Sequence, residues 1–227
     1  GGTLAVTGIT TSFAALTQMV QDRENQVDQD LFLTDLGRWG LELSYLISSF
    51  VISFVMQVFM FIIMSLYFQE ILVMSHLLEI SLIMLLSSLL STLVNALLIY
   101  HFQSVDSLGK VATIIGTASG FLVGTYVPMG ILPNFAQLLM KCTPATYIAS
   151  LYRQVLMREQ LDSTFMGNNS LLEEFQEKLG VQIHWQELLT KEETYLIVVS
   201  ICLLTFLLWL VLIKISSKKK YNSFILS

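Results

Sequence analysis

Two blocks of the chain are so uniformly apolar that they restrict it to a membrane fold. Residues 45–68 contain no charged side chain, and residues 194–214 contain only a terminal lysine. Each block has the length, roughly 20 residues, at which an α-helix crosses the hydrocarbon core of a bilayer. Charged residues make up 13% of the 227, about half the 25% that is usual in a soluble domain. We therefore expect a membrane protein rather than a soluble globular domain.

Three further stretches are apolar enough to span a membrane. They are residues 1–20, which are rich in Gly and Thr, residues 78–100, and residues 111–131, which open after Lys110. Backbone groups inside a bilayer must be hydrogen-bonded within the protein, so each stretch should be a helix. The sequence thus predicts an all-α polytopic bundle with about five spans.

The basic residues predict how the bundle is oriented. Four lysines follow the last span, at positions 214 and 218–220, and short cytoplasmic segments of membrane proteins are enriched in Lys and Arg. We therefore expect a cytoplasmic C-terminus, with residues 21–44 and 101–110 inside and residues 132–193 outside. The chain opens with Gly-Gly and has neither an initiator Met nor a positively charged signal region, so we expect a preceding part with at least one more span.

The inside segment 21–44 is unusually acidic for a loop between spans. Val27, Leu31 and Thr34 share one face, which favours a short amphipathic helix on the membrane surface. A solvated loop is the alternative on composition alone. Acids gain nothing at an anionic leaflet, so a docked partner protein would account for them. The charged residues that we expect to contact such a partner are Arg23, Glu24, Asp28, Asp30, Asp35 and Arg38.

The outside segment 132–193 should itself be helical. Pro128 and Pro133 are expected to end the fourth span. Two short amphipathic helices should follow, divided by Pro144, and both should lie in or dip into the outer leaflet. A third helix is indicated by the capping box from Ser170 to Glu173, with Gly180 as its C-cap.

Two groups of small and polar residues lie within the predicted spans. Gly116, Gly120 and Gly124 form overlapping small-xxx-small motifs, which let helices or subunits approach closely. Polar side chains follow one face of the third span, and they either bond neighbouring helices or line a substrate path. Helix packing is favoured, and both roles can coexist at a subunit interface. The residues of this face include Ser88, Thr92 and Asn95.

Motifs for chemistry are absent from the sequence. It contains no phosphate-binding loop, no HExxH and no GxSxG. Its three histidines are in separate regions, and Cys142 and Cys202 should lie at different depths and not pair. The net charge of −5 leaves no polybasic surface for nucleic acid. We expect no catalytic residue, no metal site and no cofactor in this chain.

The order of these features resembles the ABC-2 type transporter permeases. The matching residues are an inside loop beginning Gln21 to Glu24 and running through Thr34 to Arg38, then a span opening Leu43-Ser44-Tyr45. Residues 116–156 match more strongly: a Gly-rich span end, two prolines, and outer re-entrant helices with the Pro144-to-Arg153 spacing. The likeness covers essentially the whole chain as spans two to six of a six-span unit. One departure is Thr34-Asp35, where the family commonly has Ser-Pro or Thr-Pro.

The resemblance implies a function for the whole chain. Two such permeases, identical or related, would enclose a path through a bacterial plasma membrane and contact its lipids. Each would dock onto a separate ATPase subunit that binds ATP and Mg²⁺, with residues 21–44 as the coupling loop. ATP hydrolysis would then drive export of a drug, as in multidrug efflux, or of a lipid, glycan or peptide. No residue of this chain would catalyse a covalent step.

Two other classes of protein remain as alternatives. A membrane sensor or scaffold would also combine spans with a capped external helical segment, and co-purification with an ATPase would argue against it. A membrane-embedded enzyme would need polar groups converging at one depth, and only the Ser/Asn face of the third span offers any.

Overall fold

The computed structural model describes residues 1–27, 37–68, 76–165, 169–185 and 187–225. Side chains at positions 37, 38, 68, 162, 169 and 216–225 lie outside this description. In the described part all regular elements are helices. They are α1 (Gly2–Glu24), α3 (Gly37–Phe68), α4 (Leu77–Ile99), α5 (Val105–Leu122), the 3₁₀ turn η2 (Met129–Ile131), α6 (Asn134–Cys142), α7 (Pro144–Leu156), α8 (Arg158–Thr164), α9 (Asn169–Leu179) and α10 (Lys191–Ile225).

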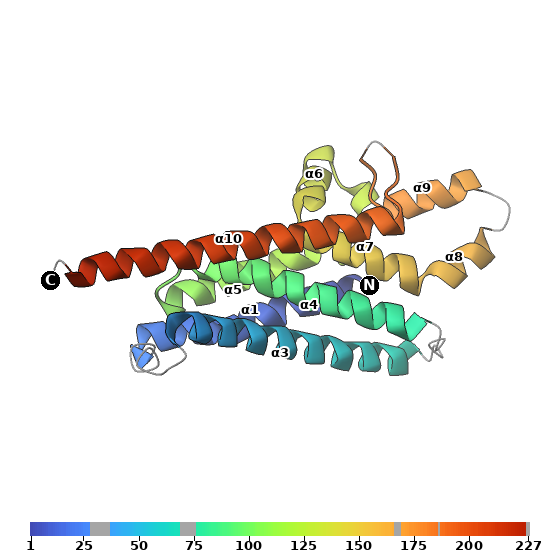
Figure 1. The fold of residues 1–227 in the computed structure, drawn as a ribbon. Coiled ribbons are helices and arrows are strands. Elements are labelled where there is room, and N and C mark those ends of the chain that lie inside the picture. Colours follow the sequence, from blue (N-terminus) through green and yellow to red (C-terminus); the bar gives the residue numbers. More distant parts are fainter. Residues whose placement is uncertain (28–36, 69–75, 166–168, 186, 226–227) are drawn as a thin grey trace.

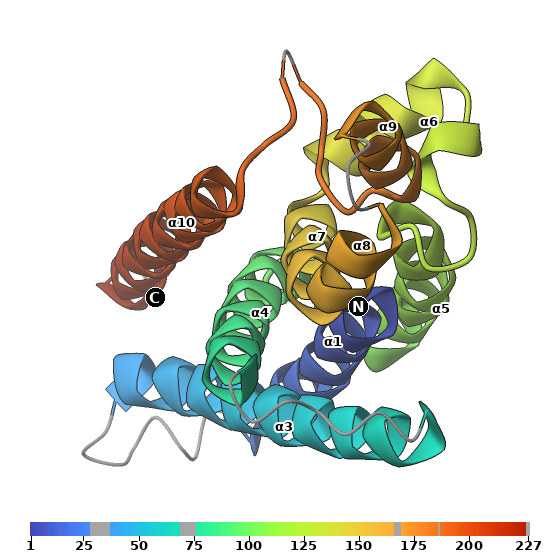
Figure 2. The same cartoon turned by 90° about the vertical axis from the view of Figure 1, so that its right-hand side faces the viewer.

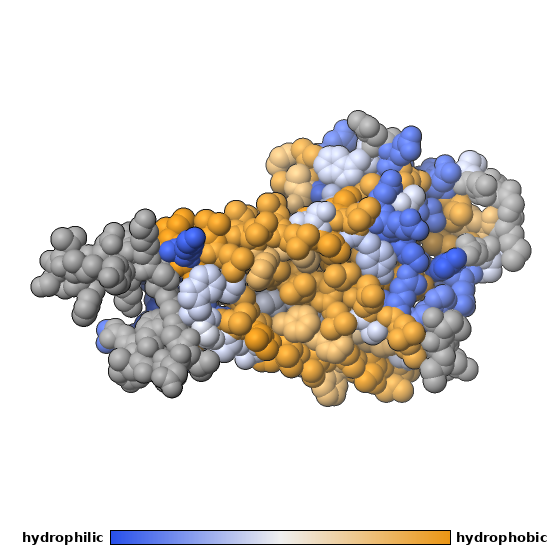
Figure 3. Space-filling view, in the orientation of Figure 1, coloured by the Kyte–Doolittle hydropathy of each residue, from blue (hydrophilic) through white to orange (hydrophobic). Residues whose placement is uncertain are grey.

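Five long helices run back and forth as a bundle (Figures 1 and 2). At one end, which we call the head end, lie residue 1, the starts of α4 and α10, and the shorter helices α6, α8 and α9. At the other end, the loop end, lie the end of α1, the start of α3 and the turn at 101–104. An apolar band covers the middle of the bundle, and polar residues gather at the head end (Figure 3).

Among the described residues, four helices are long and apolar enough to cross a membrane: α1, α3, α4 and α10. The fifth, α5, has 18 residues and begins with Asp106 and Lys110 in its first turns. It is therefore the weakest of the five predicted spans, although it runs beside the others in the bundle (Figure 2). An all-α membrane bundle is confirmed by this architecture.

The predicted limits of the fourth span, 111 and 131, are wrong at both ends. Helix α5 begins six residues earlier, because the Ser104 side chain accepts a hydrogen bond from the Ser107 amide and caps it. It ends at Leu122, ahead of Gly124, whose φ of +70° is left-handed and breaks the helical path. Pro128 and Pro133 therefore do not end this helix, and instead precede η2 and α6.

The inside loop is also shorter than the predicted range 21–44. Helix α1 continues to Glu24, and α3 is already helical from Gly37. The predicted amphipathic surface helix, with Leu31 and Thr34, falls within 28–36 and lies outside the described residues.

The two helices divided by Pro144 form as predicted, but only one is at the surface. Helix α6 exposes Phe135, Leu138 and Leu139. Helix α7 packs against α1, α4 and α10, and Ile148 and Tyr152 are almost completely buried. The apolar face of α7 therefore packs against other helices of the chain and is not exposed like that of α6, while the expectation that both helices lie in or dip into the outer leaflet stays a prediction.

The third predicted helix of the outside segment is α9, and Gly180 ends it. Gly180 has a φ of +65°; its amide donates to the Glu177 carbonyl, and the Val181 amide donates to the Gln176 carbonyl. This pair of hydrogen bonds is the Schellman motif. Helix α9 begins at Asn169, one residue ahead of the Ser170 that the sequence predicted as its cap.

Candidate functional site

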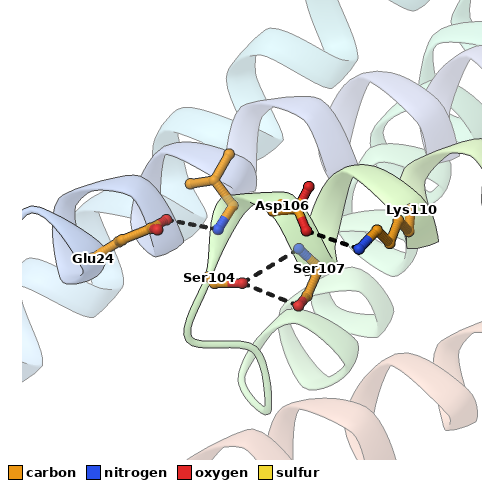
Figure 4. Close-up of polar contacts among 6 residues, drawn as sticks. Glu24, Ser104, Asp106, Ser107 and Lys110 are labelled. Atoms are coloured by element: carbon orange, nitrogen blue, oxygen red, sulfur yellow. Dashed lines mark hydrogen bonds and ion pairs between the residues drawn. The ribbon is translucent and has the colours of Figure 1, made fainter.

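The last turn of α1 is the part of the predicted coupling loop that the structure describes. The Arg23 guanidinium donates to the carbonyls of Tyr100 and Phe102, at 3.4 and 3.3 Å. A carboxylate oxygen of Glu24 accepts a 2.7 Å hydrogen bond from the amide of Val105, the first residue of α5 (Figure 4). Both side chains thus contact the turn between α4 and α5.

The structure does not describe the side chains of the other predicted coupling residues. Asp28, Asp30 and Asp35 lie outside the described residues, and Arg38 is in the first turn of α3 with its side chain outside the description. Their role at an ATPase stays a prediction.

A line of buried polar side chains runs between α1, α3, α4 and α7, and we call it the polar seam. At its centre Gln57 of α3, fully buried, donates to Ser88 at 2.7 Å and accepts from the Tyr152 hydroxyl at 2.8 Å. Ser53, one turn earlier on α3, donates to the Gly8 carbonyl at 3.0 Å. A buried polar group without a partner is costly, so these bonds hold four helices in register.

The seam continues toward the loop end through the rest of the predicted polar face. Asn95 donates to the Ile9 carbonyl at 2.9 Å and to the Ser12 hydroxyl at 2.7 Å. Thr92 lies 3.3 Å from Ser49, hydroxyl to hydroxyl. All three predicted residues of the path, Ser88 included, therefore bond neighbouring helices.

Asn95 also reaches a cavity of about 200 Å³ beside the seam. The cavity lies between α1, α4, α5 and the start of α7, and its walls are mostly apolar, including Ile9, Val94, Ile115 and Leu122. One residue of the predicted path thus lines an apolar space, while also bonding α1.

Sequence reasoning missed the α3 side of the seam. Ser49, Ser53 and Gln57 are all fully buried, and they recur every fourth residue, which places them on one helical face. That spacing within an otherwise apolar block was the available signal.

The three glycines of the predicted packing motif have different surroundings. A Cβ on Gly116 would meet nothing within 4 Å. A Cβ on Gly120 would clash with the ring of Tyr126, which lies in the loop between α5 and η2. Gly124 has its positive φ and lies beside Arg153. Of the three, only Gly116 therefore has open space beside its Cα, where a second chain could approach.

Arg153 is buried at the head end, and its guanidinium holds two helix ends together. It donates to the carbonyls of Val123 and Gly124 at 2.8 Å each, after α5, and to that of Gly180 at 3.0 Å, after α9. Burial lowers the pKa of Arg153 to about 10, so the side chain stays charged at neutral pH. The Pro144-to-Arg153 spacing thus positions a structural clamp.

A charged pair completes the head end. The Lys191 ammonium lies 2.6 Å from Glu79 and ties the start of α10 to the start of α4. Among the described residues no group of His, Cys, Asp or Glu is placed to hold a metal ion. The described contacts therefore join helices to one another and leave an apolar cavity beside Asn95.

Comparison with known protein families agrees with this architecture. The family model described as "ABC-2 family transporter protein" matches residues 2–215, nearly the whole chain. The chain therefore belongs to the ABC-2 transporter family and is a membrane permease component of an ABC transporter, a class that has no ATPase site of its own. No curated protein and no solved structure matches it.

Proposed function

We propose that this chain is the permease subunit of an ATP-driven exporter in a bacterial plasma membrane, with its loop end in the cytoplasm and its head end outside. The observation that carries the proposal is the family match over residues 2–215, on a bundle whose basic tail follows the last span at the loop end. The excess of lysine there favours a cytoplasmic location.

A separate ATPase subunit would dock at the loop end, through the acidic segment that includes Asp28, Asp30 and Asp35. A second permease copy, or a related permease, would complete the path, and we place that contact at the open side of Gly116. The cargo would be a drug, lipid, glycan or peptide, as the family resemblance implies. The apolar cavity beside Asn95 would suit the apolar part of a drug or lipid.

The direct test is purification of the tagged chain from membranes in mild detergent. We expect an ATPase with a phosphate-binding loop to co-purify, and the complex to hydrolyse ATP in a vanadate-sensitive manner. Changing Asp28, Asp30 and Asp35 together to Lys should reduce the amount of co-purified ATPase, since like charges set against a basic rim cost several kcal/mol.

A matched control reverses three acids at the opposite end of the molecule. Glu173, Glu174 and Glu177 are exposed on α9, and changing them to Lys should leave ATPase binding unchanged. Equal binding by the loop-end variant would reject the docking site. If no ATPase accompanies the wild-type protein, the chain is better described as a membrane sensor or scaffold.

A further inference from the structure

Three consecutive residues at the end of α1 each bond a different helix of the same chain. Asp22 accepts from Tyr45 of α3, Arg23 donates to the end of α4, and Glu24 accepts from the start of α5. Only residues 25–27 separate them from the acidic segment 28–36, so a displacement of that segment would be passed to them along the chain.

The charges of Arg23 and Glu24 match the helix ends that they contact. Helix α4 ends at Ile99, and the Arg23 guanidinium bonds the carbonyl oxygens of Tyr100 and Phe102 and lies 6.0 Å from the centre of the Tyr100 ring. A helix C-terminus carries unpaired carbonyls and a partial negative charge, which a cation stabilises.

Glu24 makes the complementary contact on the other side of the turn. Its carboxylate accepts from the amide of Val105, where the partial positive charge of an N-terminus favours an anion. The Ser104 side chain caps the Ser107 amide of the same first turn (Figure 4). Adjacent residues of opposite charge thus hold the two opposite helix ends that flank one short turn.

Asp22 adds the third connection. One of its carboxylate oxygens accepts from the Tyr45 hydroxyl, and the other accepts from Gln18 of α1 at 2.6 Å. The Gln18 bond orients the carboxylate, so the end of α1 is also tied to α3.

We propose that Asp22, Arg23 and Glu24 form a transmission joint. They position α3, α4 and α5 relative to the end of α1 and convey movement of the ATPase-docking segment into those helices, instead of contacting the ATPase themselves. The proposal rests on the proposed function, and it separates the residues that bind the ATPase from those that pass its movement on.

The chain offers an isosteric variant and a matched control for this joint. Glu24→Gln keeps the size of the side chain and removes its charge. Asp106→Asn removes a charge from the first turn of α5, but the Asp106 carboxylate pairs with Lys110 of the same helix at 2.8 Å and points away from Glu24 (Figure 4). Exchanging Arg23 and Glu24 keeps the net charge and sets each residue against the wrong helix end.

The test measures ATPase binding and ATP hydrolysis separately, on the complex of the chain with its co-purifying ATPase in lipid nanodiscs. All variants should bind the ATPase as the wild type does. In Glu24→Gln the ATP hydrolysis that the permease stimulates should fall by a factor of about two to five, as expected for the loss of one charge at a helix end. The exchange variant should lose more, and Asp106→Asn should behave as wild type.

Each outcome decides a separate claim. Reduced ATPase binding by Glu24→Gln would place Glu24 at the ATPase surface and overturn the joint. Wild-type hydrolysis in Glu24→Gln, or in the exchange variant at equal membrane abundance, would overturn it as well. Failure of the wild-type chain to bind any ATPase would instead reject the proposed function.

Discussion

At the scale of single residues, Arg153 shows how backbone carbonyls stabilise a buried charge. Its guanidinium donates to three of them, two following α5 and one following α9. Carbonyls at helix ends carry partial negative charge, so they substitute for an anion in part. The cost of burial remains in the pKa, which is lowered to about 10.

Replacing Arg153 with Met should strongly destabilise the protein. The variant leaves three carbonyls without their donor, and buried unpaired groups cost about 1–3 kcal/mol each, so we expect a loss of roughly 3 kcal/mol or more. Thermal unfolding in detergent micelles measures it. Arg158→Met, at the exposed arginine that begins α8, should change stability by about 0.5 kcal/mol or less. Equal unfolding temperatures for the two variants would contradict the clamp.

At the scale of elements, the glycines of α5 separate contacts within the chain from contacts with a second chain. Gly120 is closed by the Tyr126 ring, whereas Gly116 has nothing within 4 Å. The small-xxx-small spacing that both share therefore does not define one common interface. Gly120 of α5 packs against Tyr126 in the loop that follows the helix, whereas the space beside Gly116 is open.

Changing Gly116 to Leu should preserve the fold of the single chain, because the space next to its Cβ is open. If a second permease packs against this face, the variant should instead lose assembly, which cross-linking in native membranes and size-exclusion chromatography measure. Gly120→Leu should lower the unfolding temperature by displacing Tyr126. Undisturbed assembly of the Gly116 variant would remove this face from the subunit interface.

At the scale of the whole molecule, the bundle has two chemically different ends. The head end gathers polar residues around α8, α9 and the Glu79–Lys191 pair, and the loop end carries the joint at the end of α1 and the basic tail (Figure 3). Between them the polar seam is enclosed by an apolar surface. The two ends are therefore suited to different compartments.

Cysteine labelling tests the orientation of these ends. With exposed Cys142 changed to Ser, a cysteine at exposed Thr164 of the head end should react with an impermeant thiol reagent in intact cells. A cysteine at exposed His101 of the loop end should react only after the membrane is permeabilised. Labelling of the His101 position in intact cells would reverse the orientation.

The sequence by itself determined the class of fold and most of its elements. Apolar blocks of bilayer length force helices, because no other open structure satisfies its backbone in lipid. Pro144 divided α6 from α7, and Gly180 ended α9, because both act through local backbone geometry. The order of these elements was also enough to indicate the permease family, which the match over residues 2–215 confirms.

Only the tertiary structure decided what each polar residue does. Arg23 and Glu24 have the charges of a surface contact, yet they bond helix ends within the chain. An apolar face on α7 predicts a membrane surface or a core equally well, and packing against α1, α4 and α10 selects the core. The local sequence pattern predicts whether a residue lies on a polar or an apolar face of its helix. The residue that it contacts belongs to another helix, far away in the sequence, and cannot be read from that pattern. The spacing of Gln57 in the sequence could place it on a polar face, but only the fold supplied its partners, Ser88 and Tyr152.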